Sequence, residues 1–182
     1  MLLGKFARFI LWIFGWKIRG EAPKEKKYVV IIAPHTSNLD FFVGKLANWA
    51  MGVKPKIIIK KEAFNFFTSP IIKMWGGIPV DRSKSGGVVG EVVRLFQKKD
   101  KFILGITPEG TRKRNPNWKT GFYRIAAAAG VPICLSFIDF GKKELSMERM
   151  FYPTGDMEKD IYEIKQYYKN KTGYHPEKFA IE

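Results

Sequence analysis

The sequence predicts a single α/β domain in which a β-sheet is flanked by helices. Short runs of β-branched residues, typical of buried strands, alternate along the chain with longer segments of helical spacing. Apolar residues make up 46% of the 182 positions, enough to build a full core. Several polar motifs directly follow predicted strands, where chemistry on α/β folds usually lies.

The predicted elements alternate along most of the chain. Strands are expected at 28–33, 56–59, 78–80, 102–106 and 131–138. Helices are expected at 39–51, 62–75, 87–99, 120–129 and 156–171. Residues 20–27 are polar and predict a connector, and a polar tail follows the last helix. The sequence therefore divides into an N-terminal segment, 1–19, and a main domain, 20–182.

The N-terminal segment is apolar, aromatic and bordered by cations. Its apolar run covers only residues 9–16, while a membrane span needs about 20 apolar residues. No Ala-x-Ala-like cleavage site follows it, so a secretory signal is not expected. Tryptophans and cations around a short apolar run are typical of an amphipathic helix lying in the headgroup layer. An ordinary amphipathic helix that caps the core is the alternative.

The charge of the chain limits the kinds of partner. It carries 32 Lys and Arg against 17 Asp and Glu, a formal net charge of +15, with a sequence pI of about 9.9. Such a surface attracts nucleic acid, anionic lipid headgroups or acidic acyl carriers, and composition does not choose among them. The one cysteine, Cys134, lies in an apolar run and is expected to be a small buried core residue.

The first chemical motif is Pro34-His-Thr-Ser-Asn-Leu-Asp40, after the strand at 28–33. Residues five apart in one ideal helix point ~140° away from each other. His35 and Asp40 can therefore meet only if His35 lies in the turn and Asp40 in the first helical turn. Ser37 or Asn38 can cap that helix. Asp40 would then orient the imidazole as a base; a turn histidine beside a capping aspartate is the alternative.

Two further motifs follow predicted strands. Thr107-Pro-Glu-Gly-Thr-Arg112 places an acid and an arginine on either side of a glycine, so that Arg112 and backbone N–H groups near Gly110 can bind an anion. Gly76-Gly-Ile-Pro-Val-Asp-Arg82 ends in a second arginine. Each alone is equally consistent with a charged surface turn.

Together, the order and spacing of these motifs resemble the glycerolipid acyltransferase family, which includes 1-acylglycerol-3-phosphate acyltransferases. The matching blocks are His35–Asp40, Gly77–Arg82, Pro108–Arg112 and Val131–Ile133, within residues 20–140. The resemblance implies a glycerol-phosphate acyltransferase-like mixed sheet flanked by helices, with an N-terminal helix on the membrane surface. It assigns His35 as general base and Asp40 as its orienting carboxylate. Binding of the acceptor phosphate is assigned to Arg82, Glu109, Gly110, Thr111 and Arg112.

The resemblance also implies the reaction and its setting. A fatty acyl chain would pass from acyl-coenzyme A or acyl carrier protein, as substrate, to the hydroxyl of a lysolipid such as lysophosphatidate. No cofactor or metal is expected, and with two His and one Cys the chain has few of the usual zinc ligands. The protein would act in phospholipid synthesis, peripheral or monotopic on the cytoplasmic face of a membrane.

Three alternatives remain open at this stage. A basic nucleic-acid-binding module fits the charge, although no nucleic-acid recognition signature is found and no such partner is expected. A non-catalytic lipid-surface protein would need His35 or Asp40 to be lost, and both are present. An acyltransferase for another lysolipid or an aminolipid hydroxyl keeps the same chemistry and changes only the acceptor.

Overall fold

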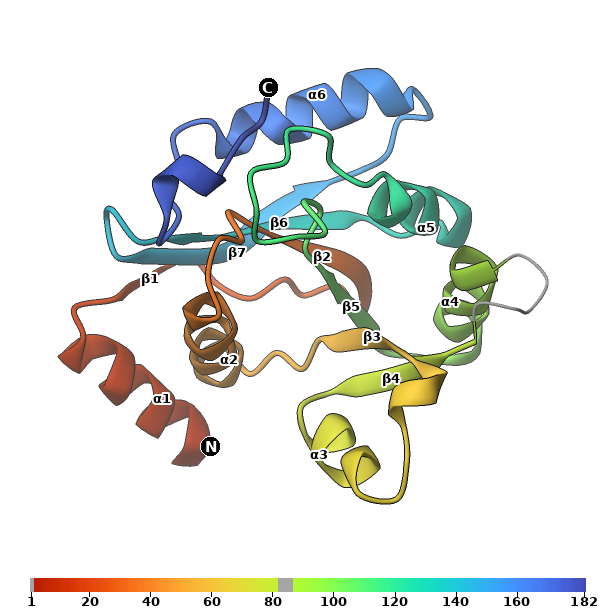
Figure 1. Ribbon diagram of the computed structural model, residues 1–182, viewed down its shortest axis with the longest axis horizontal. Helices are drawn as coiled ribbons and strands as arrows, with labels where there is room; N and C mark the ends of the chain where they lie inside the picture. Colours follow the sequence, from red (N-terminus) through yellow and green to blue (C-terminus); the bar gives the residue numbers. More distant parts are fainter. Residues whose placement is uncertain (1, 82–86) are drawn as a thin grey trace.

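The protein is built on one seven-stranded mixed sheet (Figure 1). This computed structural model describes residues 2–81 and 87–182. The strands lie in the order β1-β7-β6-β2-β5-β3-β4, and only the β6–β7 pair is antiparallel. Their bounds are β1 Lys17–Arg19, β2 Lys27–Ala33, β3 Lys56–Lys60, β4 Gly77–Val80, β5 Phe102–Ile106, β6 Ile133–Asp139 and β7 Glu144–Phe151.

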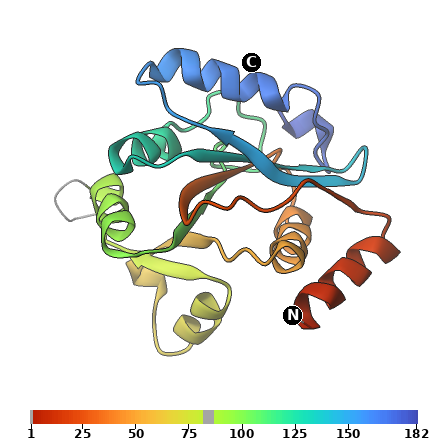
Figure 2. The same ribbon diagram turned by 180° about the vertical axis from the view of Figure 1, so that it is seen from behind.

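Helices cover both faces of the sheet, which confirms the predicted α/β fold. Figures 1 and 2 show α4, α5 and α6 on one side and α1, α2 and α3 on the other. The α-helices are α1 Leu2–Ile13, α2 Leu39–Met51, α3 Thr68–Met74, α4 Gly87–Lys98, α5 Gly121–Ala129 and α6 Met157–Tyr168. Two short 3-10 helices, η1 Lys61–Ala63 and η2 Pro176–Lys178, complete the described elements.

Strand β2 lies at the centre of the sheet and supplies core residues to both faces. Val29, Ile31 and Ala33 pack into the cluster that includes α4, α5 and α6, whereas Tyr28 and Val30 belong to a cluster on the other face. This alternation follows from the two-residue period of a strand. Because both faces are covered, the strand is a nearly continuous apolar run, as is usual for central parallel strands.

Two strands were not predicted. β1 has only three residues, too few to form a visible pattern. β7 contains charged residues among its apolar ones and pairs with β6 across a register shift between Leu135 and Phe137, so its alternation is imperfect. The antiparallel β6–β7 hairpin is what makes the sheet mixed.

The helix expected at 62–75 is two shorter pieces, η1 and α3. The break lies at Asn65, whose side-chain oxygen accepts hydrogen bonds from the backbone N–H groups of Phe67 (3.0 Å) and Thr68 (2.9 Å). Asparagine side chains compete with helical backbone bonding in this way, so the chain turns before α3 begins. The continuous helix prediction was therefore wrong between 64 and 67.

The N-terminal helix packs directly against the domain. Ala7 and Leu11 are buried with Ala47 and Ala50 of α2, and a Cβ built on Gly4 would lie 3.0 Å from the carbonyl oxygen of Trp49. β1 then pairs with β7, so the first 19 residues contain both α1 and an edge strand of the sheet. Within the described ranges, no helix is long and apolar enough to cross a bilayer.

Candidate active site

Two of the three predicted motifs meet at the carboxyl ends of two neighbouring parallel strands. β2 and β5 pair with Ile31 opposite Ile106, so β2 ends at Ala33 beside the loop that follows β5. His35 is the second residue after β2, and Glu109 lies in the loop after β5. This edge of a parallel sheet is where α/β folds usually place their chemistry.

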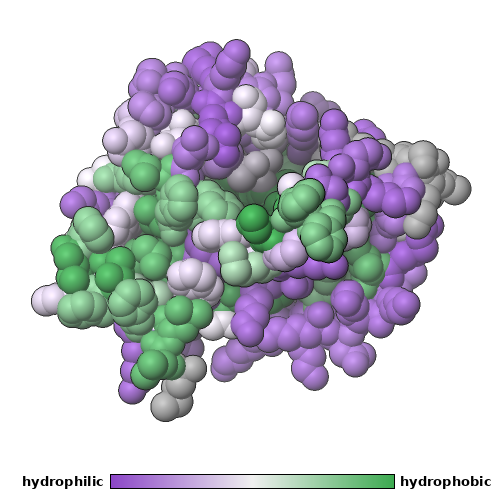
Figure 3. Space-filling view, turned by 60° about the horizontal axis from the view of Figure 1, so that its bottom comes forward, coloured by the Kyte–Doolittle hydropathy of each residue, from purple (hydrophilic) through white to green (hydrophobic). Residues whose placement is uncertain are grey.

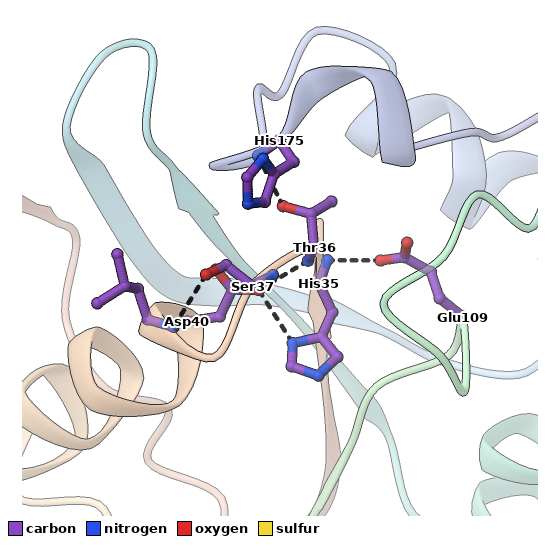
Figure 4. A network of polar contacts seen from close by, with 7 residues as sticks. His35, Thr36, Ser37, Asp40, Glu109 and His175 are labelled. Carbon is purple, nitrogen blue, oxygen red and sulfur yellow. Dashed lines mark hydrogen bonds and ion pairs between the residues drawn. The ribbon is translucent and has the colours of Figure 1, made fainter.

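His35 and Asp40 are in direct contact, as the spacing predicted. The Nδ1 atom of His35 lies 3.0 Å from Oδ2 of Asp40, and the side chains are 15% and 2% exposed (Figure 4). The same Oδ2 accepts backbone N–H bonds from Thr36 (2.7 Å) and Ser37 (2.9 Å). One carboxylate oxygen therefore holds both the imidazole and the loop that carries it.

This geometry fixes which ring nitrogen is available for proton transfer. A carboxylate accepts hydrogen bonds, so the neutral ring carries its proton on Nδ1 and Nε2 is the basic atom. Figure 4 shows Nε2 directed away from Asp40. Ser37 also supports the start of α2, because its Oγ accepts from Leu39 N at 3.1 Å, whereas Asn38 makes no side-chain cap bond.

Glu109 lies inside the protein and supports the histidine loop. Its side chain is fully buried, and its Oε1 accepts a hydrogen bond from the backbone N–H of His35 at 2.6 Å (Figure 4). Burial raises the pKa of Glu109 to about 8; the nearby Asp40 adds to this rise and the His35 N–H opposes it. In this structure the carboxyl group binds the backbone of the protein itself. Glu109 therefore positions the loop that carries His35.

Three of the other predicted phosphate-binding residues, Gly110, Thr111 and Arg112, lie in the loop after β5. Gly110 has a positive φ of 67° and donates its N–H to the carbonyl of Thr107 at 3.1 Å, so this donor serves the turn. Thr111 Oγ1 accepts from Lys113 N. Arg112 is exposed and lines the same cavity as His35. Arg82 lies outside the described residues.

A mostly apolar cavity of about 270 Å³ lies beside His35. Its lining includes Gly44 and Ala47 on α2, Gly105 on β5 and Trp75 at the end of α3. The small residues leave room where larger side chains would fill the gap between helix and sheet. The volume approaches the ~300 Å³ at which small-molecule pockets begin.

Lys45 is a cavity residue that the sequence did not indicate. Its ammonium lies 5.5 Å from the ring centre of Trp75 and 5.7 Å from that of Trp49, and Nζ donates to the Trp75 carbonyl at 3.4 Å. Burial lowers its pKa, as does the charge of Lys56. Trp49 lies one turn further along α2, but Trp75 and its carbonyl group come from the end of α3, so the sequence around Lys45 does not indicate this site.

The segment after α6 also reaches the site. The backbone N–H of His175 donates to Oγ1 of Thr36 at 3.1 Å (Figure 4), and a Cβ built on Gly173 would lie 2.7 Å from that oxygen. The contact uses the backbone of His175 and not its imidazole ring. Across the described ranges, no three His, Cys, Asp or Glu side chains come together as a metal site.

Comparisons with known proteins give the site its context. A family model described as Acyltransferase matches residues 16–135. The 1-acyl-sn-glycerol-3-phosphate acyltransferase of Escherichia coli (strain K12) is 26% identical over 149 residues, covering 76% of this chain and 59% of that protein. The Haemophilus influenzae protein of the same name is 27% identical, covering 66% and 53%. The chain thus spans just over half the length of the curated relatives it matches.

A solved structure shares the fold. The crystal structure of the 1-acyl-sn-glycerophosphate (LPA) acyltransferase PlsC from Thermotoga maritima aligns with a TM-score of 0.57 at 17% identity, covering 94% of this chain and 80% of that one. At this identity the likeness shows that the two chains share an architecture.

Proposed function

Because the chain belongs to the acyltransferase family, we propose that it transfers a fatty acyl chain from an acyl thioester to the hydroxyl of a glycerolipid acceptor such as lysophosphatidate. The single observation that carries the proposal is the His35–Asp40 pair, with Nδ1 held 3.0 Å from the carboxylate beside an apolar cavity. The names of the E. coli and H. influenzae relatives support the choice of acceptor.

The proposed reaction is a direct transfer. Nε2 of His35 removes the proton from the acceptor hydroxyl as that oxygen attacks the thioester carbonyl carbon. Asp40 stabilises the imidazolium that forms and keeps the ring oriented. The tetrahedral intermediate then expels the thiolate, which takes the proton from His35. The products are the acylated lipid, with a new ester bond, and the free thiol of the carrier.

The apolar lining of the cavity is consistent with an acyl chain as substrate. The positively charged residues of the cavity are consistent with an anionic acceptor. Ile32, Met51 and Ile57 are among the cavity residues that an acyl chain would contact, and such contact removes apolar surface from water. Among described residues of the cavity, Lys45 and Arg112 carry formal positive charge. Arg112, exposed near His35, is the group we assign to the acceptor phosphate, together with Arg82. The donor is proposed to be acyl-coenzyme A or acyl carrier protein.

The N-terminal helix supports a location on the membrane surface. Leu2, Phe6, Phe9 and Ile13 point away from the domain and are between 54% and 86% exposed. They form one arc of α1, and Lys5 and Arg8 lie at its border, as in helices that rest in the headgroup layer. We propose that the protein binds the cytoplasmic face, where anionic lipids attract its positive charge.

The test is acyl transfer by purified protein from palmitoyl-coenzyme A, or palmitoyl-acyl carrier protein, to lysophosphatidate. We expect product from the wild type and a loss of at least 10²-fold in kcat for His35→Ala, because the general base is absent. Asp40→Asn should also lose turnover, since an amide cannot stabilise the imidazolium. Lys98→Ala, an exposed change at the end of α4, is the matched control. Equal turnover by wild type and His35→Ala would contradict the proposed mechanism.

A further inference from the structure

A second exposed apolar surface lies on and before α3, away from the N-terminal helix. Phe66 is 87% exposed, Phe67 81%, Met74 71% and Ile71 57%. These four side chains, here called the α3 surface, come from nine consecutive residues. Single exposed apolar side chains are ordinary, but a contiguous group of large ones marks a place where a partner binds.

The local structure holds these side chains outward. Phe67, Ile71 and Met74 follow the i, i+4, i+7 spacing of one helical stripe. The opposite side of α3 packs inward: Ile72 lies against Gly77 of β4, and Trp75 packs on Phe41 of α2 with ring centres 5.1 Å apart. The exposed stripe is therefore the outward side of a helix whose inward contacts are also apolar.

The tip of the α3 surface is built from two adjacent aromatic rings. Phe66 and Phe67 contact each other edge to face at 5.4 Å. The turn that carries them is held by the Asn65 side chain and by a hydrogen bond from Thr68 Oγ1 to the Ala63 carbonyl. A well-bonded turn therefore presents both rings to solvent.

The charges around the α3 surface are mostly positive. Lys60, Lys61 and Lys73 are exposed, and Glu62 is the one acidic residue between 60 and 74. Lys61 also lies 3.4 Å from Asp81. Apolar and aromatic side chains with lysines beside them suit the interface of an anionic bilayer, where the rings enter the acyl boundary and the ammonium groups meet phosphates.

The α3 surface and the exposed arc of α1 lie on the same side of the molecule. Figure 1 shows both helices below the sheet, and Figure 3, which brings this side forward, shows apolar side chains over α1 with a second, smaller apolar group beside them. Trp75, which ends α3, lines the same cavity as His35. A single flat partner can therefore touch both helices on the side of the molecule where they lie.

We propose that the α3 surface is a second membrane-contact element, which enters the same anionic lipid bilayer as α1. The proposal rests on the membrane location given under the proposed function and adds a second point of attachment. Two separated contacts define the tilt of the domain on the bilayer, which one helix alone does not. A carrier protein recognised by charge would not need two phenylalanines at the most exposed point, so a bilayer fits these residues better.

The first test uses a fluorescent label on cysteine. Phe67→Cys is labelled with an environment-sensitive dye, and the wild type is carried in parallel because its Cys134 is buried. With vesicles of phosphatidylcholine and phosphatidylglycerol, we expect a blue shift and a gain in emission at position 67. A label at Tyr162→Cys, 63% exposed on α6 at the far side of the sheet, should not change.

A third label, Phe9→Cys on α1, separates the possible outcomes. A response at Phe9 without one at Phe67 overturns the α3 proposal and leaves the α1 contact standing. A response at neither position overturns the membrane location itself, and with it this inference. Responses at Phe9 and Phe67, with none at Tyr162, support both contacts.

The second test measures binding and turnover. Phe66→Ser combined with Phe67→Ser should weaken sedimentation with the same vesicles by about tenfold or more, because two rings no longer leave water. The KM for vesicle-borne lysophosphatidate should rise, while turnover of short-chain, water-soluble substrates stays unchanged. Tyr152→Ser combined with Tyr162→Ser, both 63% exposed, is the matched control. Unchanged vesicle binding, or a loss of carrier-protein binding instead, overturns the proposal.

Discussion

Glu109 combines deep burial with a bond to the backbone of the proposed base. Its Oε1 atom accepts from His35 N, while Oε2 is buried with no hydrogen-bond partner among the described residues. A protonated carboxyl group costs far less to bury than a charged one, which is why the pKa rises to about 8. Gain or loss of the proton on Glu109 should therefore affect the conformation of the His35 loop.

We predict that Glu109 makes the protein less stable as the pH rises. The folded protein holds the proton up to about pH 8, whereas the unfolded chain releases it near 4.5. The unfolded state thus binds fewer protons between these values, and the free energy of unfolding falls across this window, by on the order of 5 kcal/mol. Glu109→Gln cannot ionise and should flatten this fall.

Urea unfolding of both proteins at several pH values measures the effect. The difference in stability, variant minus wild type, should grow from pH 4.5 to pH 8. Glu158→Gln, an exposed change on α6, provides the control and should follow the wild-type curve. Parallel curves for Glu109→Gln and wild type would show that this carboxyl group is not held neutral.

The sequence predicted the His35–Asp40 contact because both residues lie in one local turn. The two side chains can meet only when His35 lies in the turn after β2 and Asp40 lies in the first turn of the helix. A serine that can cap this helix makes that arrangement possible. The position of Glu109 required knowledge of a long-range pairing, that of β2 with β5. The burial of Glu109 and its bond to His35 N depend on that pairing, so spacing alone did not indicate a positioning role.

The segment that follows α6 acts as a support for the catalytic loop. Tyr168, at the end of α6, is fully buried and donates to carbonyls of Ile31 (3.3 Å) and Ser136 (3.1 Å) in the central strands. Beyond it, Gly173 lies against Thr36 and Pro34. These residues follow the stretch matched by the family model, 16–135, and still contact the loop that carries His35.

We predict that Gly173→Ala lowers both stability and turnover. The new methyl group would lie 2.7–2.8 Å from Thr36, which is 2% exposed and has no space to move, so the tail or the catalytic loop must shift. Overpacking of this kind costs ~1–3 kcal/mol. Thermal unfolding and kcat, measured on the same preparations, test it.

Gly121→Ala is the control for this variant. A Cβ at Gly121 meets nothing within 4 Å, and this residue begins a helix, where alanine is favourable. It should leave both quantities near their wild-type values. Gly173→Ala with wild-type kcat and stability would exclude a supporting role for the tail.

At the level of elements, local patterns predicted the strongly periodic segments. The helix at 39–51 and the strand at 102–106 have the bounds that their spacing indicated. The errors came where tertiary contacts override local pattern: the Asn65 side chain breaks the helix at 62–75, and β7 gains its strand form by pairing with β6.

For the whole molecule, the excess of positive charge should control the strength of membrane binding. With a net charge of +15, we expect binding to anionic vesicles to weaken at least tenfold between 50 mM and 500 mM NaCl, because salt screens the attraction. Binding to neutral phosphatidylcholine vesicles, driven by apolar side chains, should change little. Vesicle sedimentation across a salt series measures both.

The same salt series tests the nucleic-acid alternative. DNA and RNA of mixed sequence should bind more weakly than anionic vesicles at 150 mM salt, since the apolar arc of α1 has no partner on a nucleic acid. Tighter binding to nucleic acid than to vesicles would favour the alternative.

Strand β1 has a consequence for how the whole molecule reaches a membrane. A tight turn joins α1 to it, with Trp16 N bonded to the Leu11 carbonyl and Lys17 N to that of Lys143, and β1 then pairs with β7. The helix α1 is thus held at a fixed angle to the sheet before the protein contacts lipid. In the proposed mode, docking requires little ordering of the chain, so the protein retains most of the free energy of lipid contact as affinity. The distance between His35 and the bilayer is then determined by the folded protein alone, before it binds lipid.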